Sequence, residues 1–225
     1  MRLILFDIDG TLIDSGGAGT RSLNLAFKEL FSIMNAFQDI SMAGKTDTQI
    51  IKEGLLKHSM SVNGNLDVVI SIYLKHLQME ISNNMRHIKP GIYELLEEFS
   101  HITDIRLGLL TGNIELGARI KLGPFKLNEY FPTGAFGSDD EDRNKLLPIA
   151  VRRFEELCQR MIGIDECIVV GDTPRDVYCA KIYGAMCIGV ETGPYSIDEL
   201  IEAGADFVVK DLTDIYNFRQ LLKMI

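Results

Sequence analysis

The amino-acid sequence predicts an α/β fold, a doubly wound, Rossmann-like parallel sheet with an all-helical domain inserted after the first strand. Three observations predict it. Several short runs are apolar at every position, which is typical of strands buried on both faces of a sheet. Segments with helical periodicity lie between these runs, as expected for parallel strands joined by helices. One long stretch near the start of the chain has helical patterns and no strong strand signal.

The expected strands begin with Leu3–Phe6, which an acidic residue follows directly. The other apolar runs are Leu107–Leu110, Cys167–Val170, Met186–Val190 and Phe207–Val209. Sheets of this kind bind ligands outside the carboxyl ends of their strands. The residues that follow these runs are therefore the first candidates for a functional site.

Residues 15–88 form the expected helical domain. Apolar residues recur at helical spacing between positions 23 and 31 and between positions 66 and 77, and residues 50–56 indicate a shorter helix between them. Glycines at the start of this stretch give a flexible entry, and Pro90 begins the next helix after its end. The expected domains are an α/β core of residues 1–14 and 89–225 and a helical cap of residues 15–88.

The composition is that of a soluble globular protein, with 46% hydrophobic and 24% charged residues. No apolar run is long enough for a membrane span, and the first run is too short for a secretory signal, so we expect a cytoplasmic protein. The net charge of −9 disfavours nucleic acid and anionic membranes as partners. Four cysteines without CxxC spacing predict neither a zinc site nor a disulfide framework. No large apolar seam calls for an obligate oligomer, so a monomer or a weak homodimer is expected.

Two carboxylates follow the first strand. Asp7 and Asp9 lie two residues apart in an extended segment, so both side chains are expected to face one pocket. Carboxylates this close repel each other unless a cation lies between them or one is protonated. Gly10 allows a sharp turn and a close approach of a ligand to the backbone. The alternative interpretation is a strand end followed by turn-forming acids.

A second motif, Thr111-Gly112-Asn113, follows the next expected strand. Asn113 fits the N-cap of the following helix. The Thr111 hydroxyl and free backbone N–H groups at a helix start are suited to an anion such as phosphate. An ordinary capping turn is the alternative.

A cation for an anionic substrate is expected shortly before the helix that contains Pro148 in its first turn. Lys145 is the first candidate. Arg143 lies two residues upstream and is a rival, and a solvated surface lysine is the alternative interpretation.

A further pair of acids follows the strand Cys167–Val170. Asp172 comes at the end of this strand, as Asp7 does at the end of the first. Asp176 fits the third helical position of a capping box begun by Thr173, which is a structural alternative to a functional role. Oxygen ligands from Asp7 and Asp172 suit Mg²⁺ with several waters retained.

These motifs occur in one order at the ends of separate expected strands, and with them the chain resembles the haloacid dehalogenase-like (HAD) hydrolase superfamily. The resemblance is to its phosphoglycolate phosphatase and β-phosphoglucomutase-like branch, whose helical cap matches the insertion. The motifs span residues 7–176. One departure is Lys145-Leu146, where the family usually has Lys-Pro.

The resemblance implies a catalytic mechanism. Asp7 would be the nucleophile that forms an aspartyl-phosphate, and Asp9 would protonate the leaving alkoxide and then activate water. Mg²⁺ would be held by Asp7, by the backbone carbonyl of Asp9 and by Asp172. Asp176 would act through a metal-bound water or by holding a ligand in place.

The same resemblance implies how the substrate is held. Thr111 with the neighbouring Gly112 and Asn113 would bind phosphoryl oxygens, and Lys145 would balance their charge. Lys45, in a loop that resembles the substrate-specificity loop of the cap, would contact a substrate carboxylate or phosphate, and a solvated lysine is the alternative.

The function implied is a phosphatase that hydrolyses a small phosphorylated metabolite. Asp9 favours phosphomonoester chemistry, because relatives that cleave carbon–halogen or carbon–phosphorus bonds lack an acid there. A sugar phosphomutase is the alternative within the family. A catalytically silent module that binds a phosphorylated ligand is the alternative from another class.

Overall fold

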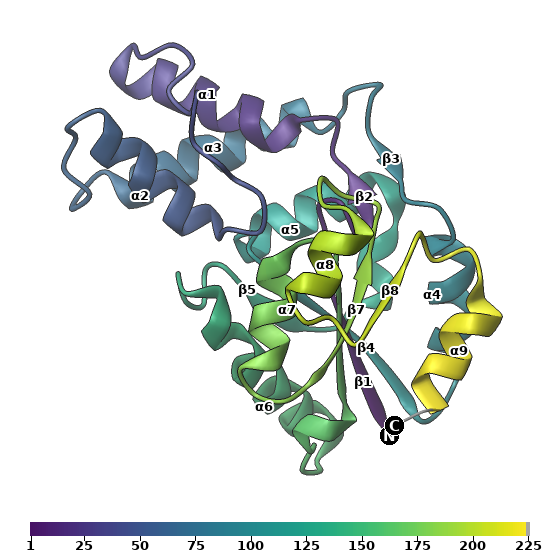
Figure 1. Ribbon diagram of the computed structural model, residues 1–225. Coiled ribbons are helices and arrows are strands. Elements are labelled where there is room, and N and C mark those ends of the chain that lie inside the picture. Colours follow the sequence, from purple (N-terminus) through teal and green to yellow (C-terminus); the bar gives the residue numbers. More distant parts are fainter. Residues whose placement is uncertain (224–225) are drawn as a thin grey trace.

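The structure, a computed structural model, describes residues 1–223 and contains a parallel six-stranded sheet with helices on both faces (Figure 1). The strand order is β5-β4-β1-β6-β7-β8. The strands of this sheet are β1 (Arg2–Phe6), β4 (Ile105–Thr111), β5 (Gly134–Phe136), β6 (Cys167–Gly171), β7 (Met186–Val190) and β8 (Phe207–Val209). The expected fold class is thereby confirmed, and each of the five expected apolar runs lies in a strand.

Helices cover the two faces of the sheet in separate sets. The helices of the α/β layers are α4 (Ile92–Ser100), α5 (Glu115–Leu122), α6 (Leu146–Cys158), α7 (Pro174–Lys181), α8 (Ile197–Glu202) and α9 (Ile215–Lys223). Ile4 and Phe6 of β1 pack with α4, α5 and α9, whereas Leu3 and Leu5 pack with α6, α7 and α8. Because successive side chains of a strand point to opposite faces, the continuous apolar run of β1 supplies both cores.

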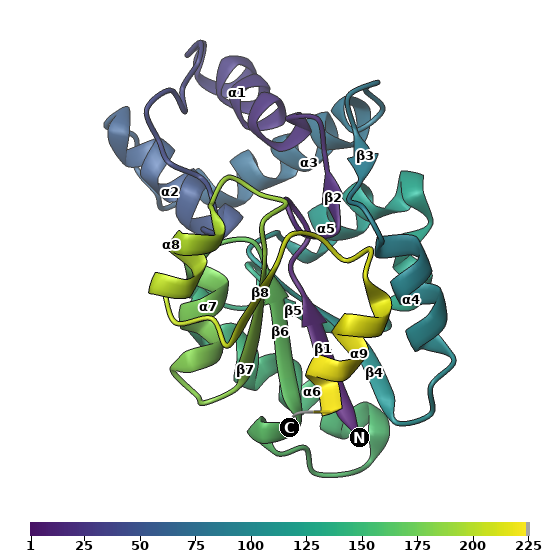
Figure 2. The same ribbon diagram turned by 45° about the vertical axis from the view of Figure 1, so that its right-hand side comes forward.

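The remaining helices lie over the carboxyl ends of the strands (Figures 1 and 2). They are α1 (Ala18–Phe31), α2 (Asp47–Lys57) and α3 (Leu66–Glu80), and their apolar faces form a hydrophobic cluster of their own. The two chain segments that lead into and out of these helices pair as a short antiparallel ribbon, β2 (Ile13–Asp14) with β3 (His87–Ile88). The sequence did not predict this ribbon or β5, because none of these two- or three-residue strands is a continuous run of large apolar residues, as the equally short β8 is.

Local sequence explains where the helices near the sheet edge begin. Thr46 is the N-cap of α2 and accepts a hydrogen bond from the backbone of Gln49. Thr173, Pro174 and Asp176 form the predicted capping box at the start of α7. Within residues 1–223, no helix combines the length and the apolar character needed to cross a lipid bilayer.

Candidate active site

The sheet brings three sequence-distant segments to one edge. The strands β4, β1 and β6 are neighbours in the sheet, and their carboxyl ends carry Thr111, Asp7 and Asp172. The Asp7 backbone N–H donates to the Val170 carbonyl at 3.0 Å, which fixes the chain after β1 beside the end of β6. The predicted convergence of Asp7 and Asp172 follows from this pairing.

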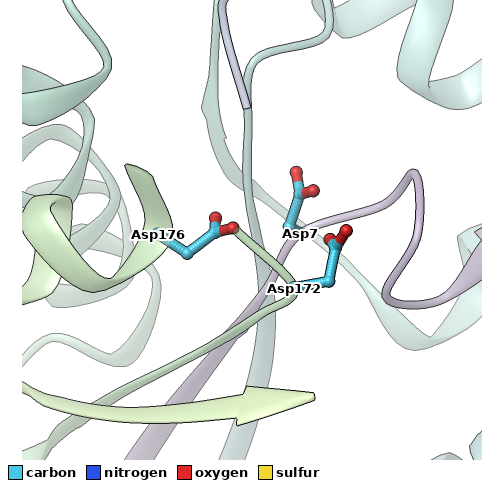
Figure 3. Close-up of side chains that lie close together, drawn as sticks. All are labelled: Asp7, Asp172 and Asp176. Atoms are coloured by element: carbon cyan, nitrogen blue, oxygen red, sulfur yellow. The ribbon is translucent and has the colours of Figure 1, made fainter. Parts of the chain in front are cut away.

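Asp7, Asp172 and Asp176 form an acid cluster with the carboxylates turned toward a common region (Figure 3). One oxygen of each lies within 4.8 Å of the others, and all three side chains are buried. Burial raises the pKa of Asp7 to about 6 although Arg143 opposes the shift. Burial and the neighbouring charges of Asp7 and Asp176 raise the pKa of Asp172 well above its usual range. Both shifts show that burial disfavours the ionised form of these carboxylates more than Arg143 favours it.

The surroundings of Asp172 fit a hard divalent cation. Its Oδ1 accepts a hydrogen bond from the Thr11 hydroxyl at 2.9 Å. A Cβ at Gly10 or Gly193 would lie only 2.2 or 1.7 Å from Oδ2, so only glycine leaves room for this carboxylate. Two buried carboxylates with raised pKa values, in a site of oxygen donors, are suited to Mg²⁺. The residues present can therefore hold a divalent metal.

Asp176 belongs to the acid cluster but its oxygens are already used. Its Oδ1 accepts a charge-assisted hydrogen bond from Arg143, and its Oδ2 accepts from the Thr173 backbone at 3.0 Å and the Thr173 hydroxyl at 2.8 Å. The alternative reading from the sequence, a capping box, is therefore present. Asp176 holds Arg143 and the start of α7, which leaves Asp7 and Asp172 as the carboxylates open to a cation.

Arg143, rather than Lys145, is the cation that the structure brings to the acid cluster. The Arg143 guanidinium lies 3.0 Å from Asp7 Oδ1 and donates to the Gly44 carbonyl at 2.9 Å. The Lys145 ammonium pairs with Asp140 at 3.3 Å, and 60% of this side chain is exposed. Residues 143–145 form a single 3₁₀ turn, in which side chains two positions apart point in different directions. This turn separates the two candidates.

Lys121 is a buried cation that the sequence reasoning missed. Its ammonium donates to Asp9 Oδ2 and to Asn113 Oδ1, both at 2.6 Å, and Asn113 in turn donates to Asp9 at 2.9 Å. Burial alone would raise the pKa of Asp9, but Lys121 and Asn113 lower it below its usual value. A signal was present, because Lys121 falls between Ala118 and Leu122 on the buried face of α5.

The second motif packs against the start of α2. Thr111 is fully buried, and its hydroxyl accepts hydrogen bonds from the Asn113 side chain at 2.9 Å and backbone at 3.3 Å. The expectation that Asn113 is the N-cap was wrong by one residue, since Ile114 occupies that position. The Asp47 carboxylate, at the start of α2, accepts a hydrogen bond from the Ile114 backbone at 3.0 Å, so a residue of α2 contacts the start of α5.

A cavity of about 470 Å³ separates the acids of the sheet edge from the helices α1 to α3. Gly112 and Lys45, both predicted to contact substrate, line it. A Cβ at Gly112 would lie 2.2 Å from the Lys45 carbonyl oxygen, so the close approach of the loop before α2 requires glycine there. The Lys45 ammonium pairs with Glu53 at 2.6 Å. The cavity also exposes Asp9 to a ligand.

Comparisons with known proteins agree with this geometry. Residues 4–190 match the haloacid dehalogenase-like hydrolase family. A protein of Vibrio vulnificus named phosphoglycolate phosphatase is 24% identical over 96% of this chain and 95% of its own length. One of Agrobacterium fabrum with the same name is 26% identical over 93% of this chain and 88% of its own.

Solved structures share the fold. A hydrolase from Pseudomonas syringae superposes with a TM-score of 0.71 at 23% identity, covering 98% of this chain and 99% of the other. CbbY from Rhodobacter sphaeroides in complex with phosphate superposes with a TM-score of 0.75 at 18% identity, covering 96% of each chain. The predicted enzyme class, a HAD-type phosphatase, agrees with the names of the relatives. The match over most of its length, together with the strand-end acids, shows that this chain belongs to the haloacid dehalogenase-like hydrolase family.

Proposed function

We propose that this chain is an Mg²⁺-dependent phosphatase that hydrolyses a small phosphorylated metabolite through an aspartyl-phosphate. The observation that carries the proposal is the arrangement of Asp7 and Asp172 beside Asp9 at one end of a cavity of about 470 Å³. Within the family, this arrangement joins a nucleophile, a metal site and an acid/base group. The family membership and the phosphatase names of the relatives support the reaction class.

Asp7 is assigned as the nucleophile. Its carboxylate attacks phosphorus, the bond from phosphorus to the leaving oxygen breaks, and that oxygen takes a proton from Asp9. Asp9 then takes a proton from the water that attacks the aspartyl-phosphate, which releases phosphate and restores Asp7. Asp9 Oδ2 is held by Lys121 and Asn113, Ser15 also hydrogen-bonds this carboxylate, and Asp9 lines the cavity where a substrate would bind.

Asp7, Asp172 and the backbone carbonyl of Asp9 are assigned to the metal, with Asp176 acting through Arg143 or a bound water. When bound, Mg²⁺ supplies positive charge to the phosphoryl oxygens and to the nucleophile. Its binding would also offset the repulsion between two carboxylates whose burial raises their pKa values.

Arg143 is assigned the charge-balancing role for which Lys145 was the first candidate. The guanidinium contacts the nucleophile at 3.0 Å and is 6% exposed, so it can pair with a phosphoryl oxygen without moving far. Thr111, Gly112 and Asn113 remain the proposed phosphate loop. The hydroxyl of Thr111 supports this loop through Asn113.

Residues 15–88 are proposed to act as a cap over a core of residues 1–14 and 89–225. The ribbon β2–β3 carries both connections, and Gly16 and Gly17 in the first of them have positive φ values of 62° and 74°. Such connections permit the cap to open and close as a unit. Closure over the acids excludes water from the first step of the reaction. A cytoplasmic location and a monomer or weak homodimer complete the proposal.

The test is turnover of p-nitrophenyl phosphate and of a panel of phosphorylated metabolites, with and without Mg²⁺. The panel includes phosphoglycolate because relatives of this chain are named phosphoglycolate phosphatase. It includes sugar bisphosphates because a structure of CbbY contains xylulose-(1,5)bisphosphate. Asp7→Asn is expected to abolish turnover while the circular dichroism spectrum stays unchanged. Undiminished turnover in this variant or after chelation would refute the mechanism. Phosphate binding without turnover would favour a silent module, and isomerisation without phosphate release would favour a mutase.

A further inference from the structure

The charges that line the cavity restrict what a substrate carries besides its phosphate. We propose that the preferred substrate is the phosphomonoester of a neutral, hydroxyl-bearing alcohol and that the cavity discriminates against a second anionic group. This inference rests on the proposed phosphatase function. It separates the chain from relatives that are named for phosphoglycolate, which carries a carboxylate.

Every cationic side chain that lines the cavity, within residues 1–223, has a carboxylate partner. Arg143 pairs with Asp7 at 3.0 Å, and Lys121 pairs with Asp9 at 2.6 Å. These two cations are buried and serve the catalytic carboxylates. Neither is therefore available to a distant part of the substrate.

The two remaining cations are also engaged. Lys89 donates to the Thr192 carbonyl at 2.7 Å and lies 3.8 Å from Asp14. Lys45 pairs with Glu53 at 2.6 Å. The Lys45–Glu53 pair is the one that a substrate carboxylate could replace most easily, because Glu53 is 34% exposed and regains water when it leaves.

The cavity as a whole carries excess negative charge. Five carboxylates line it against four cations, and the fifth, Asp47, accepts hydrogen bonds from a backbone N–H and the Tyr73 hydroxyl. A bound Mg²⁺ and a phosphoryl dianion offset each other, so the excess persists in the loaded site. A second anionic group would enter against this charge and lose its hydration without gaining a free cation.

Apart from Lys45 and Asp47, the residues of the cap that line the cavity are uncharged, and they suit an alcohol. Leu23, Met42 and Ile50 offer apolar contact, and the hydroxyls of Thr20 and Tyr73 offer polar contact. An alcohol with a hydroxyl group can both donate and accept here. The lining thus matches a neutral polyol-like leaving group better than a carboxylate or a second phosphate.

The test compares pairs of phosphomonoesters that differ only in CH₂OH against COO⁻. These are glycerol phosphate with phosphoglycerate, and hydroxyethyl phosphate with phosphoglycolate. We expect kcat/KM to be at least about 10-fold higher for the neutral member of each pair, since unfavourable charge juxtaposition of this kind is worth more than 1 kcal/mol. Each compound also competes with p-nitrophenyl phosphate, so the inhibition constants report the same ratio where turnover is slow.

Two matched variants locate the cause. Glu53→Gln frees Lys45 and is expected to lower the ratio of kcat/KM between the neutral and the carboxylate member by about threefold, which corresponds to about 0.65 kcal/mol. Glu80→Gln removes the partner of Arg21, which pairs at 2.6 Å but does not line the cavity, and is expected to leave the ratio unchanged. Rates on p-nitrophenyl phosphate normalise each variant for folding.

The outcomes are distinguishable. Turnover of p-nitrophenyl phosphate with equal or better use of the carboxylate members would overturn this inference and leave the phosphatase function standing. The same holds for a ratio that Glu53→Gln does not move. Failure to hydrolyse any phosphomonoester, including p-nitrophenyl phosphate, would instead overturn the proposed function on which the inference rests.

Discussion

The role of Arg143 can be tested through stability before any substrate is known. Arg143→Met removes a guanidinium that is 6% exposed and leaves Asp7 and Asp176 as buried carboxylates without a counter-charge. Removing one partner of a buried ion pair costs about 3–5 kcal/mol. For a chain of this length, such a loss lowers the melting temperature by roughly 10 °C.

The loss has a defined dependence on pH. Arg143 opposes the effect of burial on Asp7, so its removal raises the pKa of Asp7 beyond about 6. Protonation of Asp7 relieves the unpaired charge, so the destabilisation is expected to be larger at pH 7.5 than at pH 5. It does not vanish at pH 5, because Asp176 also loses its partner.

Urea unfolding of metal-free protein, followed by circular dichroism, measures the effect. Lys145→Met is the matched control, because its 60% exposed side chain pairs only with Asp140, and such a surface pair contributes less than about 1 kcal/mol. Arg143→Met combined with Asp176→Asn is expected to recover part of the loss. A loss below about 1 kcal/mol for Arg143→Met, or an equal loss for Lys145→Met, would refute the reasoning.

Three further outcomes follow from the site. Gly193→Ala places a Cβ 1.7 Å from Asp172 Oδ2 and is expected to weaken Mg²⁺ binding, measured by calorimetry, by at least about 10-fold. An unchanged affinity would contradict the inference that glycine at this position makes room for the Asp172 carboxylate. Lys121→Met is expected to lower kcat on p-nitrophenyl phosphate by about 100-fold through misplacement of Asp9, with Mg²⁺ affinity retained. The folded state raises the pKa of Asp7 above that of the unfolded chain, so the metal-free protein binds more protons when folded and loses stability as pH rises from about 4 to about 6. Thermal unfolding should show this slope in the wild type and a smaller one in Asp7→Asn.

The strand-end acids were predictable because the relevant information is local. A continuous apolar run followed by Asp predicts a buried strand with a carboxylate at its end, and parallel strands end at the same edge of the sheet. Asp7 and Asp172 were placed together by this rule, and the structure confirms that they are close. The local sequence at the end of each strand was sufficient for this prediction.

The cations were harder to predict because their roles depend on packing between elements. A single 3₁₀ turn directs Arg143 toward the acid cluster and Lys145 away from it, and two basic residues two positions apart do not reveal this turn in the sequence. Lys121 reaches Asp9 only because α5 crosses the end of β1, a contact between residues 112 positions apart. Its place on the apolar face of α5 was a signal, since a buried lysine needs a partner.

The two cations explain why carboxylates only two residues apart have opposite electrostatic environments. Lys121 and Asn113 lower the pKa of Asp9, whereas burial leaves that of Asp7 raised to about 6 even beside Arg143. A nucleophile must be ionised, and with a pKa of about 6 Asp7 is mostly but not fully ionised at neutral pH. A cation at the open oxygens of Asp7 and Asp172 would favour the ionised form of both carboxylates further. Lys121 and Asn113 favour the ionised form of Asp9, and in the proposed mechanism a phosphoryl dianion beside it would raise its pKa toward the value that a general acid requires. In that mechanism the metal would serve the nucleophile as well as the phosphate.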